Sequence, residues 1–326
     1  MLMIRSTRKF PSLPYFWSLI DWSLPSLKPY KGKLLRAQTI EDLAQIAKKR
    51  TPKVVFDYVE GSAVDEIAYA RSRDALSRIE FNSRVMRDVS KLDTSEKILG
   101  KAVDIPICFA PTGYTRLMHH VGEPAVANVA SKKNLIYALS TMGTTSPEEL
   151  AAAVPNSRRW FQLYIMKNRS DSLAVIKQAK DNGFEALVLT VDTPVTGLRY
   201  RDNRNGLTVP PSLSAKTIVN AIPRPTWWLN FLLKEPLVFA SLESWNGTVA
   251  ELMNTMFDPT MTYEDLDWIR KVWDGNLLVK GIQNADDAKR AVKHGADAVH
   301  APEEAKPAAA PAAAAWRSRA SRAAQD

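Results

Sequence analysis

An acidic and a basic residue closely follow one apolar stretch of this chain. Residues 187–194 read Leu-Val-Leu-Thr-Val-Asp-Thr-Pro, and Arg199 comes shortly afterwards. The branched residues of the first half are typical of a strand buried on both faces, and the proline cannot continue the hydrogen bonding of a sheet. A carboxylate and a guanidinium at the carboxyl end of a buried parallel strand predict an active site of the kind that α/β folds build. On this stretch alone, a solvated Asp192 at an ordinary strand end is an equally good interpretation.

Polar residues also follow the other apolar stretches that we expect to form strands. These groups are Pro111-Thr112-Gly113, Ser140-Thr141, Gln162-Leu163-Tyr164 and Lys280-Gly281. Most have an ordinary explanation, since a hydroxyl can cap the next helix and an amide or a phenol can line a surface. Lys280 is harder to explain, because an ammonium group directly after an apolar strand needs an acidic partner or an anionic ligand. Together these side chains suit a large polar ring ligand that is held by many weak donors.

The elements that would position these residues alternate between strand-like and helix-like segments. Strands are expected over residues 105–110, 135–140, 160–164, 186–192 and 277–280, with the start of a sixth over 296–299. Helices are expected from Thr39, after Pro52 up to a C-cap at Gly61, over 123–133, from Pro147, over 170–182 and over 285–294. Short strands that alternate with helices predict the α/β class, with a parallel sheet and right-handed crossovers.

A long segment, residues 200–262, separates the fourth and fifth of these strands. It contains the apolar and aromatic run 227–233, which reads Trp-Trp-Leu-Asn-Phe-Leu-Leu. Such a run could lie on a membrane or on a partner subunit, or it could pack over the fold as a lid. The sequence leaves these alternatives open.

Charge and cysteine content narrow the class of protein. The chain has 326 residues and a net charge of +9, and residues 1–37 form a basic arm rich in proline and aromatic residues. The arm fits an anionic lipid surface, although an ordinary solvated lead-in is the simpler interpretation, and no nucleic-acid motif accompanies it. Cys108 is the single cysteine and lies in an apolar run, so we expect it in the core of a protein from a reducing, cytoplasmic compartment. No run approaches a transmembrane span or a signal peptide.

In this order, the motifs resemble the FMN-dependent α-hydroxy acid dehydrogenase and oxidase family, which includes glycolate oxidase, L-lactate dehydrogenase and mandelate dehydrogenase. The matching segments are 56–61 (Phe-Asp-Tyr-Val-Glu-Gly), 110–113 (Ala-Pro-Thr-Gly), 139–141 (Leu-Ser-Thr), 161–164 (Phe-Gln-Leu-Tyr), 189–194 with Arg199, and 279–281 (Val-Lys-Gly). The resemblance covers residues 38–299 and is strongest to the bacterial L-lactate dehydrogenases. It implies a (β/α)8 TIM barrel, FMN as cofactor, and oxidation of an L-2-hydroxy acid, L-lactate foremost, to the 2-oxo acid.

The resemblance also implies a role for individual residues of the cofactor site. The backbone of Pro111, Thr112 and Gly113 would lie against the flavin, and the side chains of Ser140, Gln162 and Thr190 would hydrogen-bond its ring. Lys280 would stabilise the anionic reduced flavin by its fixed positive charge. The electrons would pass on to a quinone, a cytochrome or oxygen.

The substrate site follows from the same resemblance. Tyr58, Tyr164 and Arg199 would bind the substrate, because a guanidinium can grip a carboxylate with two parallel hydrogen bonds. Tyr164 and Asp192 would take part in catalysis, with Asp192 orienting a catalytic histidine. Met142 stands where some relatives have a bulky aromatic residue, so the size of the accepted substrate is open.

One element of the family is not found in the sequence. The family's catalytic histidine lies in a Ser-Asn-His-Gly-Gly-Arg-Gln segment after the sixth strand, where this chain continues through His300 into a tail of mostly Ala, Pro and Arg. His300 does not stand at the position of that histidine. We expect residues 300–326 to be low-complexity and disordered, and the barrel to contain five to six of its eight strands, as in a truncated chain.

Three functions are therefore considered. The first is a 2-hydroxy acid dehydrogenase, homo-oligomeric as in the family and in contact with the inner face of the cell membrane through its apolar segments. The second is an inactive fragment without the histidine and the FMN phosphate site. The third, a type 2 isopentenyl diphosphate isomerase, is disfavoured by the carboxylate-binding set of Tyr58, Tyr164 and Arg199. His119 and His120 are expected in a loop, and no metal site is predicted.

Overall fold

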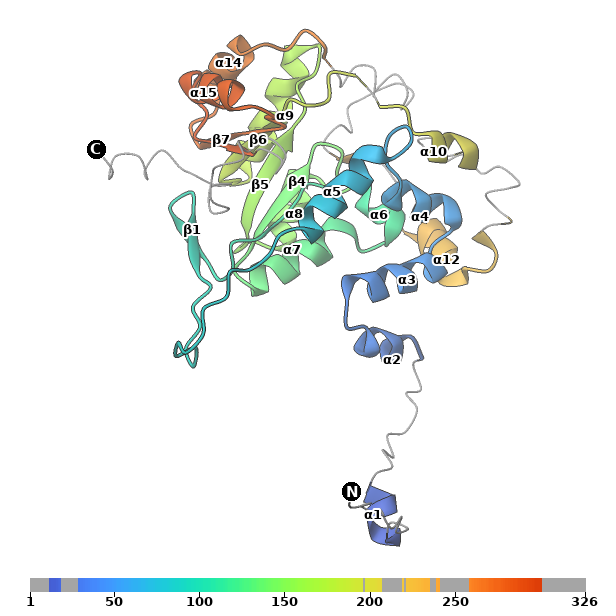
Figure 1. Cartoon of the computed structure of the whole chain (residues 1–326). Coiled ribbons are helices and arrows are strands. Elements are labelled where there is room, and N and C mark those ends of the chain that lie inside the picture. The colour runs from blue at the N-terminus through green and yellow to red at the C-terminus, as the bar shows by residue number, and fades with distance from the viewer. Residues whose placement is uncertain are drawn as a thin grey trace. The chain divides into compact units, whose positions relative to one another are not determined.

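The computed structural model describes residues 12–18, 29–195, 197–206, 219, 221–234, 239–240 and 258–300. Figure 1 shows and labels the helices and strands of these residues. The chain divides into two units, residues 1–50 and 51–326. The expected disorder of residues 300–326 does not hold at His300, which ends a strand. Residues 301–326 and most of the expected arm lie outside the described residues.

In the described part of the first unit there are three helices: α1 (Leu13–Ser18), α2 (Pro29–Arg36) and α3 (Ile40–Arg50). The predicted start of α3 is confirmed, since the Thr39 hydroxyl accepts a hydrogen bond from the Asp42 backbone N–H at 3.1 Å. The Asp42 carboxylate in turn accepts from the Thr39 N–H at 3.0 Å, which completes a reciprocal cap. This pattern explains why a short polar helix begins there.

The second unit is built around a sheet of six parallel strands in the order β3-β4-β5-β6-β7-β8. The strands are β3 (Cys108–Phe109), β4 (Ile136–Ser140), β5 (Arg158–Leu163), β6 (Ala186–Thr190), β7 (Asn276–Lys280) and β8 (Ala298–His300). Each strand pairs with the next in sequence, so the sheet forms half of a barrel. The predicted α/β class with a parallel sheet is confirmed.

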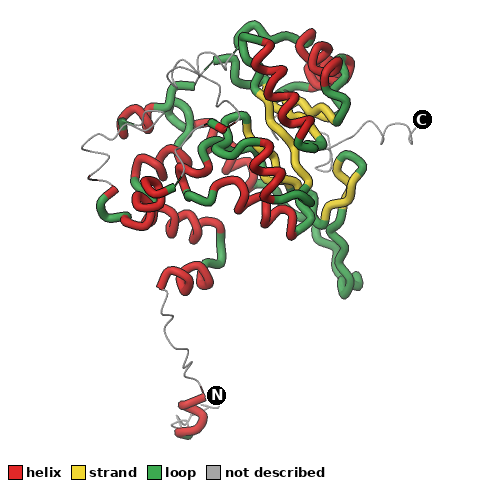
Figure 2. The backbone as a smooth tube through the Cα atoms, turned by 180° about the vertical axis from the view of Figure 1, so that it is seen from behind, coloured by secondary structure: helices red, strands yellow, loops and turns green. Residues whose placement is uncertain are grey.

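Helices cover one face of this sheet, as Figure 2 shows in red around the yellow strands. They are α7 (Gly122–Lys132), α8 (Pro147–Ala153), α9 (Arg169–Asp181), α14 (Glu264–Val272) and α15 (Ala285–Lys293). Leu139, Leu163, Leu189 and Val279 point from the strands into the apolar cluster shared with these helices. Their neighbours in sequence therefore point to the opposite, inner face, because side chains alternate along a strand.

An antiparallel hairpin covers the amino ends of the strands on the inner face. It consists of β1 (Glu96–Ile98) and β2 (Lys101–Val103), and its Ile98 and Val103 pack with Trp160, Val188 and Leu278 of the sheet. The inner face is therefore closed by apolar side chains at one end and left to polar side chains at the other.

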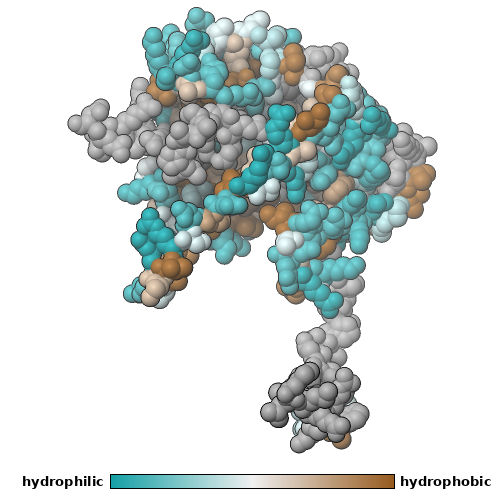
Figure 3. Space-filling view, viewed as in Figure 1, coloured by the Kyte–Doolittle hydropathy of each residue, from teal (hydrophilic) through white to brown (hydrophobic). Residues whose placement is uncertain are grey.

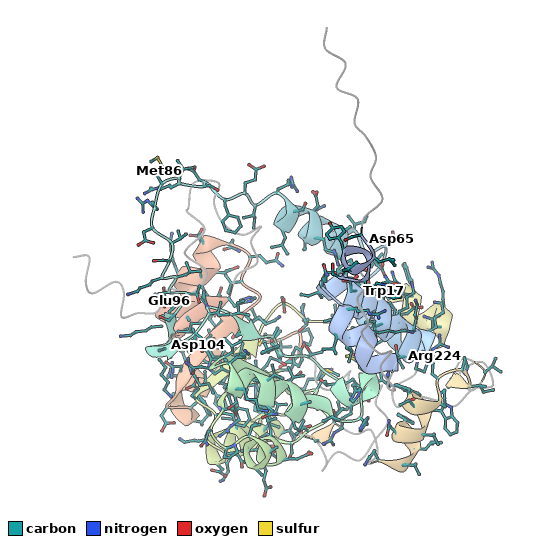
Figure 4. The ribbon with its side chains drawn as sticks, turned by 90° about the horizontal axis from the view of Figure 1, so that it is seen from below. Trp17, Asp65, Met86, Glu96, Asp104 and Arg224 are labelled. Atoms are coloured by element: carbon teal, nitrogen blue, oxygen red, sulfur yellow. The ribbon has the colours of Figure 1, made fainter. Side chains whose placement is uncertain are left out.

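The other helices that the structure describes are α4 (Lys53–Glu60), α5 (Ile67–Ser77), α6 (Thr115–Met118), α10 (Tyr200–Asn205) and α12 (Pro225–Leu233). Gly61 is the predicted C-cap of α4, and its N–H donates to the carbonyl of Asp57. A segment over residues 79–95 connects α5 to the hairpin, with Met86 at its far end (Figure 4). Figure 3 shows hydrophobic side chains gathered at this end.

Two expectations need correction. The predicted strand 105–110 is shorter, because only Cys108 and Phe109 pair with β4 while Ile105 and Ile107 are exposed. Cys108 is half-buried rather than fully in the core, although burial still raises the pKa of its thiol. None of the described helices is long and apolar enough to cross a membrane.

Candidate active site

Four predicted residues share the inner face at the carboxyl ends of their strands. Ser140 lies beside Gln162 in the register of β4 and β5, and Thr190 lies beside Lys280 in that of β6 and β7. Each of the four stands two residues after an apolar side chain of its strand that packs against the hairpin, and so lies on the same, inner face of the sheet. The structure thus brings together side chains that are far apart in the sequence.

Three of these side chains form a continuous row of hydrogen bonds. The Ser140 hydroxyl donates to Gln162 Oε1 at 3.0 Å, and Gln162 Nε2 donates to the Thr190 hydroxyl at 3.0 Å. Each of the three residues is almost completely buried. The row fixes the orientation of the Gln162 amide, because its oxygen faces Ser140 and its nitrogen faces Thr190. A buried amide held in this way presents a defined pattern of donors and acceptors to a ligand.

Lys280 has the acidic partner that its position requires. Its Nζ lies 3.5 Å from the Asp192 carboxylate, and both side chains are about one-third exposed. Gly281 follows with φ of +108°, and a Cβ at this position would lie 2.6 Å from the Asp192 Cβ. Glycine is therefore required after Lys280 for both backbone and packing reasons.

His300 ends β8 directly beside Lys280 in the strand register. Burial and the nearby Lys280 ammonium lower the pKa of His300, and Asp192 opposes them. The structure therefore groups a histidine, a lysine and an aspartate at one edge of the inner face. The role of this histidine is not assigned by the motifs.

The loops after β3 and β4 touch each other. The Tyr114 N–H donates to the Met142 carbonyl at 3.0 Å, and a Cβ on Gly113 would lie only 3.1 Å from the Met142 Cβ. Pro111 and Thr112 precede this contact. Tyr114 was not singled out from the sequence; it is buried, has φ of +57° and meets the Phe239 ring edge-to-face at 4.5 Å. A left-handed tyrosine is rare, and no sequence signal marks it.

Arg199 lies over the ring of Tyr58, with 4.8 Å between its guanidinium carbon and the ring centre. Its Nη2 donates to the carbonyls of Tyr58 and Gly61 at the end of α4, and its Nε pairs with Asp202 at 2.5 Å. Nη1 makes no hydrogen bond within the described part of the chain. The expected two-bond grip on a carboxylate would have to displace these contacts, so Nη1 is the atom best placed for a ligand.

Tyr164 completes the predicted set. Burial raises the pKa of Tyr164 most, and the nearby Asp192 and Tyr58 raise it further. The three side chains therefore lie close enough to interact electrostatically. Burial likewise raises the pKa of Tyr58, against the effect of Arg199. Both phenols therefore remain protonated at neutral pH and can donate hydrogen bonds.

A cavity of about 480 Å³ lies at the carboxyl ends of β6 and β7. Its floor includes Leu189, Val279 and Leu266, which belong to the cluster between sheet and helices. The cavity also reaches Asp192 and Gly281. Ser140, Gln162, Thr190 and Lys280 do not line it. His119 and His120 stack at 4.5 Å, and the described residues hold no group of three or more potential metal ligands.

Comparison with known proteins gives a consistent picture. The model of a family described as FMN-dependent dehydrogenase matches residues 47–301. A putative L-lactate dehydrogenase of Mycobacterium tuberculosis is 44% identical over 292 residues, which cover 90% of this chain and 70% of the relative. An L-lactate dehydrogenase of Vibrio parahaemolyticus is 35% identical over 265 residues, covering 79% of this chain and 69% of the relative.

Solved structures agree. The monotopic membrane protein (S)-mandelate dehydrogenase superposes with a TM-score of 0.78 at 32% identity, covering 84% of this chain and 74% of that one. A mandelate oxidase superposes with a TM-score of 0.67 at 32% identity, covering 81% of this chain and 68% of that one.

Proposed function

Because the chain belongs to the FMN-dependent dehydrogenase family, we propose that it binds FMN on the inner face of its sheet and oxidises an L-2-hydroxy acid, L-lactate foremost. The observation that carries this proposal is the row Ser140–Gln162–Thr190, which leads to Lys280 at the carboxyl ends of the strands. A flavin ring has a polar edge of alternating donors and acceptors, and the row offers hydroxyls, an amide and an ammonium group at one level. The donor set therefore fits the cofactor of the family.

The cofactor would be held by two groups of residues. The side chains of Ser140, Gln162, Thr190 and Lys280 would contact the ring edge, and the backbone of Pro111, Thr112 and Gly113 would lie against its face. FMN, when bound, supplies the acceptor for the electron pair that leaves the substrate. A quinone, a cytochrome or oxygen would then receive the electrons.

The substrate would lie between Tyr58, Tyr164 and Arg199. The two phenols would donate hydrogen bonds, and Nη1 of Arg199 would bind the carboxylate, which is a charge-assisted contact. Asp192 would orient the group that removes a proton from the substrate. In the structure its basic neighbour is Lys280.

A second candidate function is binding of flavin without turnover. It is favoured by the surroundings of the histidines: His294 pairs with Asp267 at 3.0 Å, away from the inner face, and His300 lies beside a lysine that lowers its pKa. Removing a general base costs a rate factor of roughly 10² to 10⁴. A chain of this kind would bind flavin, and so be yellow, but would oxidise its substrate slowly.

One purification separates these candidates. The chain is reconstituted with FMN, and the visible spectrum is followed without oxygen after addition of L-lactate, with D-lactate as control. Bleaching by L-lactate alone supports the dehydrogenase; a yellow protein that neither isomer bleaches supports binding without turnover. Both candidate functions are contradicted if the wild-type chain takes up no FMN and therefore cannot be distinguished from Q162L, in which the amide of the row is replaced.

We further propose that α12 contacts a membrane surface. Trp227 is anchored, since its Nε1 donates to the Leu117 carbonyl at 2.9 Å and its ring stacks on Phe231 at 5.1 Å. Leu229, Leu232 and Leu233 are instead exposed, as suits an interfacial helix. One relative of known structure is a monotopic membrane protein, which supports a peripheral position at the inner face of the cell membrane.

Vesicle binding tests this contact. The wild-type chain and L232D/L233D are sedimented with anionic phospholipid vesicles at low salt. We expect the wild type in the pellet and the variant in the supernatant. If both stay in solution and only the oligomeric state changes, the leucines face a second subunit and the membrane proposal is wrong.

A further inference from the structure

Glu123 is a completely buried acid that neither the motifs nor the proposed substrate site uses. It lies in the first turn of α7, and its side chain has no exposed surface. Buried carboxylates are uncommon and need hydrogen-bond partners. Among the described residues, the hydrogen-bond partners of this carboxylate all come from one loop, residues 141–145, which follows β4.

The contacts account for the whole carboxylate. Oε1 accepts from the Thr144 backbone N–H at 2.6 Å and from its hydroxyl at 2.9 Å. Oε2 accepts from the Thr145 hydroxyl at 2.8 Å and lies 2.7 Å from the Thr144 hydroxyl, whose single proton is shared between the two carboxylate oxygens. An ionised carboxylate is an acceptor only, so the loop supplies the donors that this buried group requires.

The other side of this loop belongs to the candidate cofactor site. It begins directly after Ser140, and the Met142 N–H donates to the Ser140 hydroxyl at 3.1 Å. The Met142 carbonyl accepts from Tyr114 in the loop after β3. A Cβ on Gly143 would lie 2.9 Å from the Ser140 carbonyl and 3.5 Å from Glu123 Oε1, so the chain passes closely between the acid and the site.

We propose that Glu123 is a positioning residue for the flavin ring. It holds the loop 141–145 from the side opposite the candidate cofactor site. The loop in turn orients the Ser140 hydroxyl and the Met142 backbone toward the ring. This inference rests on the proposed function. It concerns the ring and not the phosphate, because the described contacts of the loop lie next to Ser140 and Gly113, which would face the ring.

Two substitutions of Glu123 separate geometry from charge. In E123A the Thr144 N–H and the two hydroxyls lose their acceptor, and we expect ring affinity to fall by about tenfold or more, the equivalent of one or two lost hydrogen bonds. In E123Q the amide oxygen can accept from the Thr144 N–H, and the NH2 group can donate to the Thr145 hydroxyl. Positioning therefore predicts that E123Q stays within about threefold of the wild type.

E185A is the matched control. Glu185 is also a largely buried acid with several partners, which include Arg158 at 2.8 Å and Trp160 at 3.1 Å. It lies at the amino end of β6, the opposite end from the candidate site. E185A should weaken the fold without changing the affinity of the folded protein for flavin.

The experiment titrates each folded variant with riboflavin and with FMN, and follows quenching of flavin fluorescence. The inference expects the loss in E123A to be the same factor for both flavins, with E123Q and E185A close to the wild type. Should E123A fail to fold, T145V, which removes one donor to Glu123, decides the question with an expected loss of about fivefold.

Three results would overturn the inference. E123A, or T145V in its place, could bind as tightly as the wild type; E185A could lose as much affinity as E123A, so that the effect follows stability; or the loss could appear with FMN and not with riboflavin. A wild-type chain that binds neither flavin is a different outcome, because it removes the proposed function itself.

Discussion

Substituting Arg199 tests whether this residue stabilises the fold around the proposed substrate site in addition to binding a substrate. The guanidinium joins α10 to the end of α4 through two carbonyls, an ion pair and the Tyr58 ring. In R199A the Asp202 carboxylate loses its partner while it stays largely buried. Breaking a buried ion pair costs about 3–5 kcal/mol. Because the Arg199 side chain is 34% exposed, we expect a smaller loss of unfolding free energy, about 2–3 kcal/mol.

The pH dependence of R199A gives a second, independent signature. Burial raises the pKa of Asp202, and Arg199 opposes this effect. Without Arg199, the folded state holds a proton on Asp202 at a pH where the unfolded state does not. The folded form then binds more protons, so the stability of R199A rises as the pH falls through the folded pKa of Asp202, and this part of the loss is fully recovered below the unfolded pKa. We expect R199A to recover part of its loss as the pH is lowered toward the value near 3.9 at which unfolded Asp titrates.

The measurement is denaturant unfolding of the flavin-free chain at several pH values. R199A/D202N serves as the control, since it removes the unpaired carboxylate and should regain most of the stability without any pH dependence from this position. The reasoning is refuted if R199A unfolds within about 0.5 kcal/mol of the wild type, or if the double variant is less stable than R199A. Arg199 would then act on a ligand alone.

Three further predictions follow. E185A should lose about 3 kcal/mol of unfolding free energy, because Arg158 keeps a buried charge without its partner; a thermal shift no larger than that of a surface control would contradict it. The wild type should lose stability as the pH falls below about 6.5, because the lowered pKa of His300 means that the unfolded state takes up the proton first. H300N should remove this loss, and identical pH profiles of the two proteins would contradict the prediction. G281A should cost about 1–3 kcal/mol and displace Asp192, which unfolding and the pH dependence of flavin binding can check.

Most of the sheet could be predicted because its strands are continuous apolar runs that end in polar residues. Five of the six strands lie within two residues of their expected positions. The β1–β2 hairpin could not be foreseen: its strands have three residues each, and its turn holds Leu99 at a φ of +51°, where the usual Asn-Gly signal is absent. The contact between Ser140, Gln162 and Thr190 follows from strand order, which the alternation of elements also predicts.

Side chains outside the strand ends escaped prediction for a different reason. Glu123 looks in the sequence like any acid in the first turn of a helix, where a negative charge is favourable. Its burial arises from the tertiary placement of the loop after β4, and no local pattern reports that placement. Tyr114 is similar, since its left-handed backbone is imposed by the contact with Met142. Arg199 was identified, but its anchoring contacts were not.

The Lys280–Asp192 pair shows how sequence and structure jointly constrain the chemistry. The sequence requires a partner or an anionic ligand for Lys280, and the structure supplies Asp192 at 3.5 Å. This separation exceeds that of a short charge-assisted hydrogen bond, and both groups keep about one-third of their surface open. In the proposed flavin site, Lys280 would turn toward a ring that gains negative charge, while Asp192 would stay close enough to balance it when the ring is neutral. An ammonium shared in this way would stabilise the charged ligand state more than the neutral one, which is the property that transfer of an electron pair requires.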